Sequence, residues 1–253
     1  MTYPILEFDP SRPALIEPTE VLKPLPISPY CVLCFFREVI ETIVASGRSE
    51  QVAMLGSEIG PNPAYQITVD GRQLVVCHPG VGGPLAAGFL EELIALGCRY
   101  FVVCGGAGAV DGRLTLGHVV VPLTAIRDEG TSYHYLPPGR EVAASPAGVQ
   151  AIETILQRDH VPYVTGKTWT TDAIYRETPS KIAHRRAEGA LTVEMEAASL
   201  FAVAQFRQVN LAQILYAGDD VSSDSWDSRH WQRQTSLREK LFWLAAEACL
   251  EMG

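Results

Sequence analysis

The sequence predicts a single α/β domain built around a mixed β-sheet. Short apolar segments with the composition of buried strands alternate with longer segments in which apolar residues recur at helical spacing. Asp70 and Gly71 separate two strand segments, and this dipeptide indicates a tight hairpin, so at least one strand pair should be antiparallel. Residues 1–29 are rich in proline and indicate an extended arm. We therefore expect an arm over residues 1–29 and one domain over residues 30–253.

The individual elements follow in order from these patterns. Continuous apolar runs predict buried strands, and the helices begin at a proline, a glycine turn or a polar residue. The expected strands are residues 30–36, 51–55, 65–69, 73–77, 100–104, 117–125, 162–169, 191–193 and 211–217. The expected helices are residues 37–46, 84–97, 146–158, 179–188, 197–206 and 236–250.

The composition limits the classes of function. The chain has 253 residues, of which 47% are hydrophobic and 19% charged, as is typical of a globular protein. A net charge of −9 argues against nucleic-acid polymers as partners, because they require a basic surface. The sequence has neither an apolar segment of membrane-spanning length nor a secretory signal, so we expect no membrane partner and a cytoplasmic location.

The cysteine pattern favours core thiols over a metal site. Most of the six cysteines lie in apolar runs, which fits reduced thiols in a cytoplasm. Cys31 and Cys34 form a CxxC pair, but a structural zinc needs a second pair of ligands and none has suitable spacing. We therefore expect no metal.

Two carboxylates, Glu194 and Glu196, lie on either side of Met195 just before an apolar helix. Acids in a first helical turn can simply complement the helix dipole. In an extended link, however, residues two apart point the same way, so both carboxylates could face one cleft. A carboxylate there can accept from two neighbouring hydroxyls, which favours a sugar as the ligand.

Further candidate contacts lie at the carboxyl ends of expected strands, where open α/β sheets bind ligands. Residues 105–108, 194–196 and 218–220 all follow an expected strand. The glycine turn at residues 80–83 opens a helix, whose N-terminus can receive an anion.

Three motifs in this chain resemble those of the nucleoside phosphorylase family, in the same order. GVGGPLAAGFLEEL (residues 80–93) resembles the family's glycine turn and helix, GRLTLGHVVVPLTAIRDEGTSYHY (112–135) a strand and loop of uridine phosphorylases, and VEMEAAS (193–199) the ribose-site signature. The resemblance implies a three-layer, phosphorylase-like fold around a mixed, twisted sheet. It also implies cleavage of the bond between ribose C1′ and a base nitrogen, with phosphate as acceptor in the phosphorylases and water in the nucleosidases.

The resemblance assigns roles at the sugar and at the leaving base. Glu196 would hold the ribose hydroxyls, Met195 would pack on the sugar, and Glu194 would line the same wall. Asp219 matches the aspartate with which purine-cleaving members protonate the ring, a role that requires burial or a neighbouring carboxylate to favour the protonated form. The alternative for Asp219 and Asp220 is an Asp-rich loop with helix-capping roles.

The acceptor site departs from the family pattern. Phosphorylases carry a basic residue and a hydroxyl where this chain has Val103 and Gly106. The remaining candidates for binding phosphate or another anion are Gly82, Gly105, Gly106, Arg37 and Arg127. Glu38 resembles the glutamate with which nucleosidases activate water, although Arg37 and Glu38 could equally be a solvated helix start.

The base site also departs from uridine phosphorylases. TDAIYRETPSK (residues 171–181) resembles the segment that contacts the base, where Ile174 and Tyr175 match an aromatic pair. Thr178 and Ser180 replace the glutamine and arginine that read uracil, so uridine itself is unsupported. His134 is a further base-site candidate because its loop aligns with the site, although a lone histidine is more often structural.

These observations predict a nucleoside phosphorylase-like enzyme that uses inorganic phosphate as co-substrate and no other cofactor. The alternatives are a nucleosidase that uses water and a non-catalytic nucleoside-binding protein on the same fold. The expected partner is a small-molecule nucleoside, and the resemblance implies a homo-oligomer, based on dimers and extending to a hexamer in some relatives.

Overall fold

A computed structural model describes residues 3–253, so the first two residues of the predicted arm lie outside it. The strands are β1 (Tyr30–Cys34), β2 (Ser49–Ser57), β3 (Gly60–Val69), β4 (Arg72–Cys77), β5 (Tyr100–Ala109), β6 (Val119–Asp128), β7 (Glu141–Ala143), β8 (Tyr163–Thr171), β9 (Ala190–Glu194) and β10 (Asn210–Asp220). The helices are α1 (Pro18–Val21), α2 (Arg37–Ala45), α3 (Gly83–Leu96), α4 (Pro146–Arg158), α5 (Pro179–Ala187), α6 (Ala197–Arg207) and α7 (Thr235–Glu251). Short 3-10 turns are η1 (Pro4–Leu6), η2 (Ser132–His134), η3 (Ile174–Arg176) and η4 (Trp231–Arg233).

All ten strands belong to one mixed sheet, as predicted. β5 is its centre, since it pairs in parallel with β1 and β10 and antiparallel with β9. Further pairings from β10 through β6 and β8 to β9 close these strands into a ring, from which β1, β4, β3 and β2 extend. Asp70 (φ 48°) and Gly71 (φ 78°) form the β3–β4 turn, which confirms the predicted hairpin.

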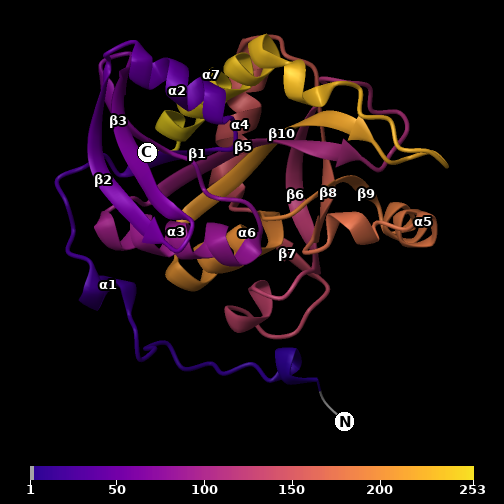
Figure 1. Ribbon diagram of the computed structural model, residues 1–253, viewed down its shortest axis with the longest axis horizontal. Helices are drawn as coiled ribbons and strands as arrows, with labels where there is room; N and C mark the ends of the chain where they lie inside the picture. Colours follow the sequence, from indigo (N-terminus) through magenta and orange to yellow (C-terminus); the bar gives the residue numbers. More distant parts are fainter. Residues whose placement is uncertain (1–2) are drawn as a thin grey trace.

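Helices cover both faces of the sheet (Figure 1). α2, α4 and α7 lie on one side, and α3 and α6 lie together on the other. The sheet and both helical layers share one continuous core, in which Phe101, Phe201 and Phe242 are fully buried. This arrangement confirms the predicted three-layer α/β class and leaves the ends of β5, β9 and β10 as the place for a site.

β5 and β10 are longer than the sequence predicted. The glycine-rich residues 105–108 were expected to follow a strand, but they continue β5 in register with β10, where Leu215 is opposite Gly105. A Cβ at Gly105 would lie 3.1 Å from the Phe35 ring, and one at Gly106 would lie 3.1 Å from the ring of Tyr216. Because both positions are glycine, the strand can pass close to the rings of Phe35 and Tyr216.

The N-terminal arm packs along the α3 and α6 side of its own domain (Figure 1). Arg12 lies over the Phe206 ring at 5.3 Å, and its Nη1 donates to the Phe206 carbonyl at 2.9 Å. Glu17 forms an ion pair with Arg207 at 3.1 Å. The side chains of Leu15 and Ile16 remain exposed.

Two further features concern membranes and thiols. Within residues 3–253, no helix is both long enough and apolar enough to cross a membrane. The six cysteines are buried and free.

Candidate active site

A cavity of about 300 Å³ lies between the last residues of β5, β9 and β10. Side chains from η3, α7 and the glycine turn at residues 80–83 close its other sides. The structure brings seven of the predicted site residues to its lining: Gly105, Gly106, Ile174, Glu194, Met195, Glu196 and Asp219. These residues come from four separate parts of the chain, so the fold joins the segments that the sequence singled out.

Glu194 is held at every oxygen by the protein. Its Oε2 accepts from the backbone N–H groups of Glu196 and Ala197 at 2.7 and 2.6 Å, and Oε1 accepts from the Thr170 hydroxyl at 2.6 Å. The carboxylate thus binds the first free N–H groups of α6, which is the capping role of an acid at a helix start. Glu194 lines the cavity, but both of its carboxylate oxygens already accept hydrogen bonds from the protein.

Glu196 has one oxygen bound by the protein. Oε1 accepts from the backbone N–H of Gly82 at 2.6 Å, and Glu196 forms no other side-chain hydrogen bond with residues 3–253. Gly82 adopts φ 89°, a left-handed conformation that favours glycine, and a Cβ on Gly83 would overlap the Ser199 hydroxyl. The glycine turn therefore places an N–H on this carboxyl and, through it, fixes the wall of the cavity.

Burial changes the protonation of both acids. Desolvation raises the pKa of Glu196 to about 8, and the neighbouring charge of Glu194 acts in the same direction. Desolvation likewise raises the pKa of Glu194 to about 7, against the three hydrogen bonds that stabilise its ionised form. Because the charge on each acid disfavours ionisation of the other, the two titrate as a pair.

A second pair of acids, Asp219 and Glu177, also lines the cavity. Asp219 accepts from the Trp226 indole N–H at 2.7 Å, and Oδ1 lies 3.5 Å from the position that a Cβ on Gly108 would take. Glu177, on the segment between η3 and α5, also lines the cavity, and desolvation followed by the charge of Asp219 raises its pKa to about 7. Glu177 lies within the base-contacting motif but was not among the predicted site residues.

Asp220 serves the surrounding loop rather than the cavity. It forms an ion pair with Arg229, and its Oδ1 accepts from the backbone N–H of Ser222 at 2.7 Å. Asp220 therefore has the predicted loop role, whereas Asp219 bonds the same loop through Trp226 and also lines the cavity.

Arg238 of α7 was also missed. Among the described residues that line the cavity, it is the only one with a positive charge. Its guanidinium lies 4.6 Å from the centre of the Phe36 ring and 2.9 Å from Oε1 of Glu38, while its Nε is buried without a hydrogen-bond partner. Gln213 adds a second buried group, since its Oε1 also lacks a partner among residues 3–253 and its side chain is 1% exposed.

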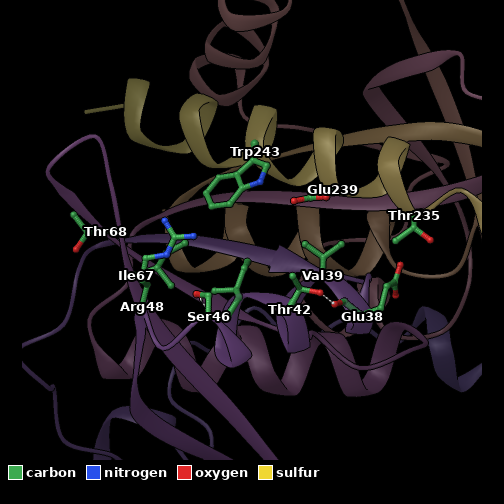
Figure 2. A pocket seen from close by; sticks show the side chains of 11 residues that line it. Glu38, Val39, Thr42, Ser46, Arg48, Ile67, Thr68, Thr235, Glu239 and Trp243 are labelled. Atoms are coloured by element: carbon green, nitrogen blue, oxygen red, sulfur yellow. Dashed lines mark hydrogen bonds between the residues drawn. The ribbon is translucent and has the colours of Figure 1, made fainter.

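Arg37 and Glu38 do not line this cavity, although Glu38 pairs with Arg238, which does. Glu38 lines a smaller cavity of about 130 Å³ between α2 and α7, which also contains Thr42, Arg48 and Glu239 (Figure 2). Arg37 is exposed, and its charge lowers the pKa of His78 after the larger effect of burial. Neither side chain lines the cavity that contains Glu196.

Three other predicted residues lie outside the cavity. Arg127 is buried and donates to the Ser132 hydroxyl and to the carbonyls of Pro137 and Leu136 at 2.8, 2.8 and 3.2 Å, so it holds its own loop. His134 is exposed in a groove beneath the N-terminal arm, and Tyr175 is 95% exposed. The motifs at residues 112–135 and 171–181 are present, but within this single chain the side chains of Arg127, His134 and Tyr175 do not line the cavity.

The cavity is lined by four carboxyl groups and lies beyond the central strands of an α/β domain, where domains of this class bind small ligands. The comparisons with known proteins identify the family. A sequence model of the phosphorylase superfamily matches residues 29–243, and the chain belongs to this superfamily. The predicted membership of a family of pentosyl-transferring enzymes is thereby confirmed.

Relatives with different substrates resemble this chain. It is 32% identical to a guanosine phosphorylase from Halorubrum lacusprofundi over 72% of its own length and 80% of the relative's. It is 29% identical to the uridine phosphorylase of Salmonella typhimurium over 54% of this chain, a match that spans 60% of that relative.

Solved structures share the fold. A uridine phosphorylase from Vibrio fischeri superposes with a TM-score of 0.73 and 26% identity, covering 90% of this chain and 91% of the other. An AMP nucleosidase from Bacteroides thetaiotaomicron gives a TM-score of 0.69 at 21% identity over 88% of this chain and 87% of the other, which shows a common fold.

Proposed function

We propose that this protein cleaves the N-glycosidic bond of a nucleoside with inorganic phosphate as the acceptor. One observation carries the proposal: Glu196 and Asp219, at the ends of the successive strands β9 and β10, line one cavity. A volume of about 300 Å³ suits a small ligand such as a nucleoside. The named guanosine and uridine phosphorylases among the relatives support phosphate as the acceptor.

In the proposed reaction, charge develops in two places. As the bond from C1′ to the base nitrogen breaks, the sugar becomes positive and the base negative. Glu196 holds the sugar hydroxyls next to the positive charge, with the Gly82 N–H fixing its position. Asp219 gives its proton to the departing base, and a phosphate oxygen forms the new bond to C1′, which yields a pentose 1-phosphate and the free base.

Arg238 is the group we assign to the phosphate. Val103 supplies no charge from β5, whereas the Arg238 guanidinium reaches the same cavity from α7 and has an unpartnered Nε. We expect Arg238→Gln to raise the KM for phosphate about 10- to 100-fold, since a hydrogen bond to a charged group contributes roughly 1.5–3 kcal/mol. The exposed Arg233→Gln is the matched control.

A hydrolytic reaction is the second candidate, because Val103 and Gly106 replace two family phosphate ligands. Release of base from a panel of nucleosides, measured with and without phosphate, separates the candidates. Turnover that requires phosphate supports the proposal, and equal rates in its absence establish hydrolysis. Saturable nucleoside binding without turnover under either condition indicates a non-catalytic binder.

We also propose a homo-oligomer. Tyr175, Ile174 and Ile59 are large apolar side chains left 95%, 54% and 68% exposed on the isolated chain. Light scattering coupled to size-exclusion chromatography measures the mass, and a monomer at micromolar concentration would contradict this proposal.

A further inference from the structure

Glu177 is a carboxylate in the cavity without a partner in the protein. Within residues 3–253 its side chain takes part in no hydrogen bond and no ion pair. The charge of Lys181 favours the ionised form of Glu177, but that ammonium pairs with Asp128 at 2.8 Å. The carboxyl oxygens of Glu177 are therefore available to hydrogen-bond a ligand in the cavity.

Glu177 lines the cavity together with Asp219, the proposed proton donor, whose charge acts on it. Because the proposed function places the base against Asp219, it places Glu177 beside the base as well. The neighbouring positions that read uracil in uridine phosphorylases do not compete for this role. Thr178 accepts from the backbone N–H of Lys181 at 3.4 Å as the N-cap of α5, and Ser180 is exposed.

We propose that Glu177 determines base specificity and that it selects guanine, whose N1–H and 2-amino group are adjacent donors on one edge. This inference rests on the proposed function. The two oxygens of a carboxylate can accept from two parallel N–H groups, the same geometry that makes paired donors from arginine favourable. A flipped or free base is commonly read along this edge.

Other bases fit this carboxylate less well. Adenine presents a lone pair at N1, which the carboxylate repels. Uracil presents one N–H between two carbonyl oxygens, and hypoxanthine lacks the 2-amino group. A site that hydrogen-bonds a ligand group discriminates strongly against analogues that lack it, because its own polar atoms then remain unpaired.

The test compares kcat/KM for guanosine, inosine, adenosine and uridine in the wild type and in Glu177→Gln, with phosphate present. We expect the wild type to prefer guanosine to inosine by about tenfold or more. Glu177→Gln should lower kcat/KM for guanosine by roughly 10- to 100-fold and change that for uridine by less than about threefold. Glu58→Gln, which removes the same charge from an exposed turn, is the matched control.

Equal losses on all four nucleosides would show that Glu177 has a structural role, and a wild-type preference for adenosine or uridine would also overturn the inference. Failure of the proposed function gives a different result, namely no base release from any nucleoside. In that case calorimetry with guanosine and adenosine decides: tighter guanosine binding that Glu177→Gln abolishes supports the inference, and equal binding overturns it.

Discussion

Glu194 and Glu196, on the part of the cavity proposed for the sugar (the fixed end), accept from backbone N–H groups, whereas Glu177 and Asp219, on the part proposed for the base (the base end), do not. Glu194 accepts three hydrogen bonds and Glu196 accepts one from Gly82, but Glu177 accepts none among residues 3–253, and Asp219 accepts one from a side chain, Trp226. The sugar is common to all nucleosides and the base is not. The difference suggests that the sugar-binding part of the cavity is preorganised for chemistry common to all nucleosides. A few substitutions in the base-binding part could then change the base that is accepted.

The largest effect is expected at the fixed end. Glu196→Gln keeps an acceptor for the Gly82 N–H but cannot become a carboxylate, so the developing charge on the sugar loses its stabilisation. We expect kcat/KM to fall by about 10²–10⁴-fold for every nucleoside. A base-release assay measures this, and a thermal unfolding midpoint near that of wild type shows that the fold is intact. Full activity in this variant would remove the sugar assignment.

The next effect is expected at the base end and should depend on the substrate. Asp219→Asn still accepts from the Trp226 N–H but has no acidic proton to give to the leaving base. We expect about a 10²-fold loss of kcat on purine nucleosides and a smaller loss on pyrimidine nucleosides. Parallel kinetics on guanosine and uridine check the difference, and identical losses would argue against ring protonation.

A substitution of Glu194 tests whether its hydrogen bonds stabilise the folded protein. In Glu194→Gln the amide nitrogen replaces an oxygen that accepts from a hydroxyl or from the N–H groups at the start of α6. One buried group then loses its partner, at a cost of about 1–3 kcal/mol in the free energy of unfolding. Urea unfolding measures the loss, and Glu58→Gln, at an exposed position, should leave stability nearly unchanged. Unchanged stability in Glu194→Gln would assign Glu194 to the ligand instead.

The sequence predicted the parts of the molecule that depend on local patterns. The hairpin at Asp70, the glycine turn before α3 and the acids before α6 are each encoded within a few adjacent residues. Arg238 and Glu177 were missed because their positions depend on how α7 and η3 pack against β5 and β10. For the same reason the sequence could not separate Glu194 from Glu196, since the hydrogen bond from Thr170 comes from another strand.

A further effect on stability is expected from pH. The pKa of Glu196 rises from an ordinary value of 4.5 to about 8 in the folded protein, mainly through burial, so the unfolded chain releases this proton first as the pH rises. Glu196 therefore contributes full stability below pH 4.5, and this contribution declines as the pH rises from 4.5 to about 8. Glu194, whose pKa is raised to about 7, acts in the same direction. The free energy of unfolding, measured in urea from about pH 5 to about pH 9, should decline less steeply in Glu196→Gln than in wild type. Parallel slopes would mean that the acids at the fixed end are already ionised, and that the contrast between the two ends lies in geometry alone.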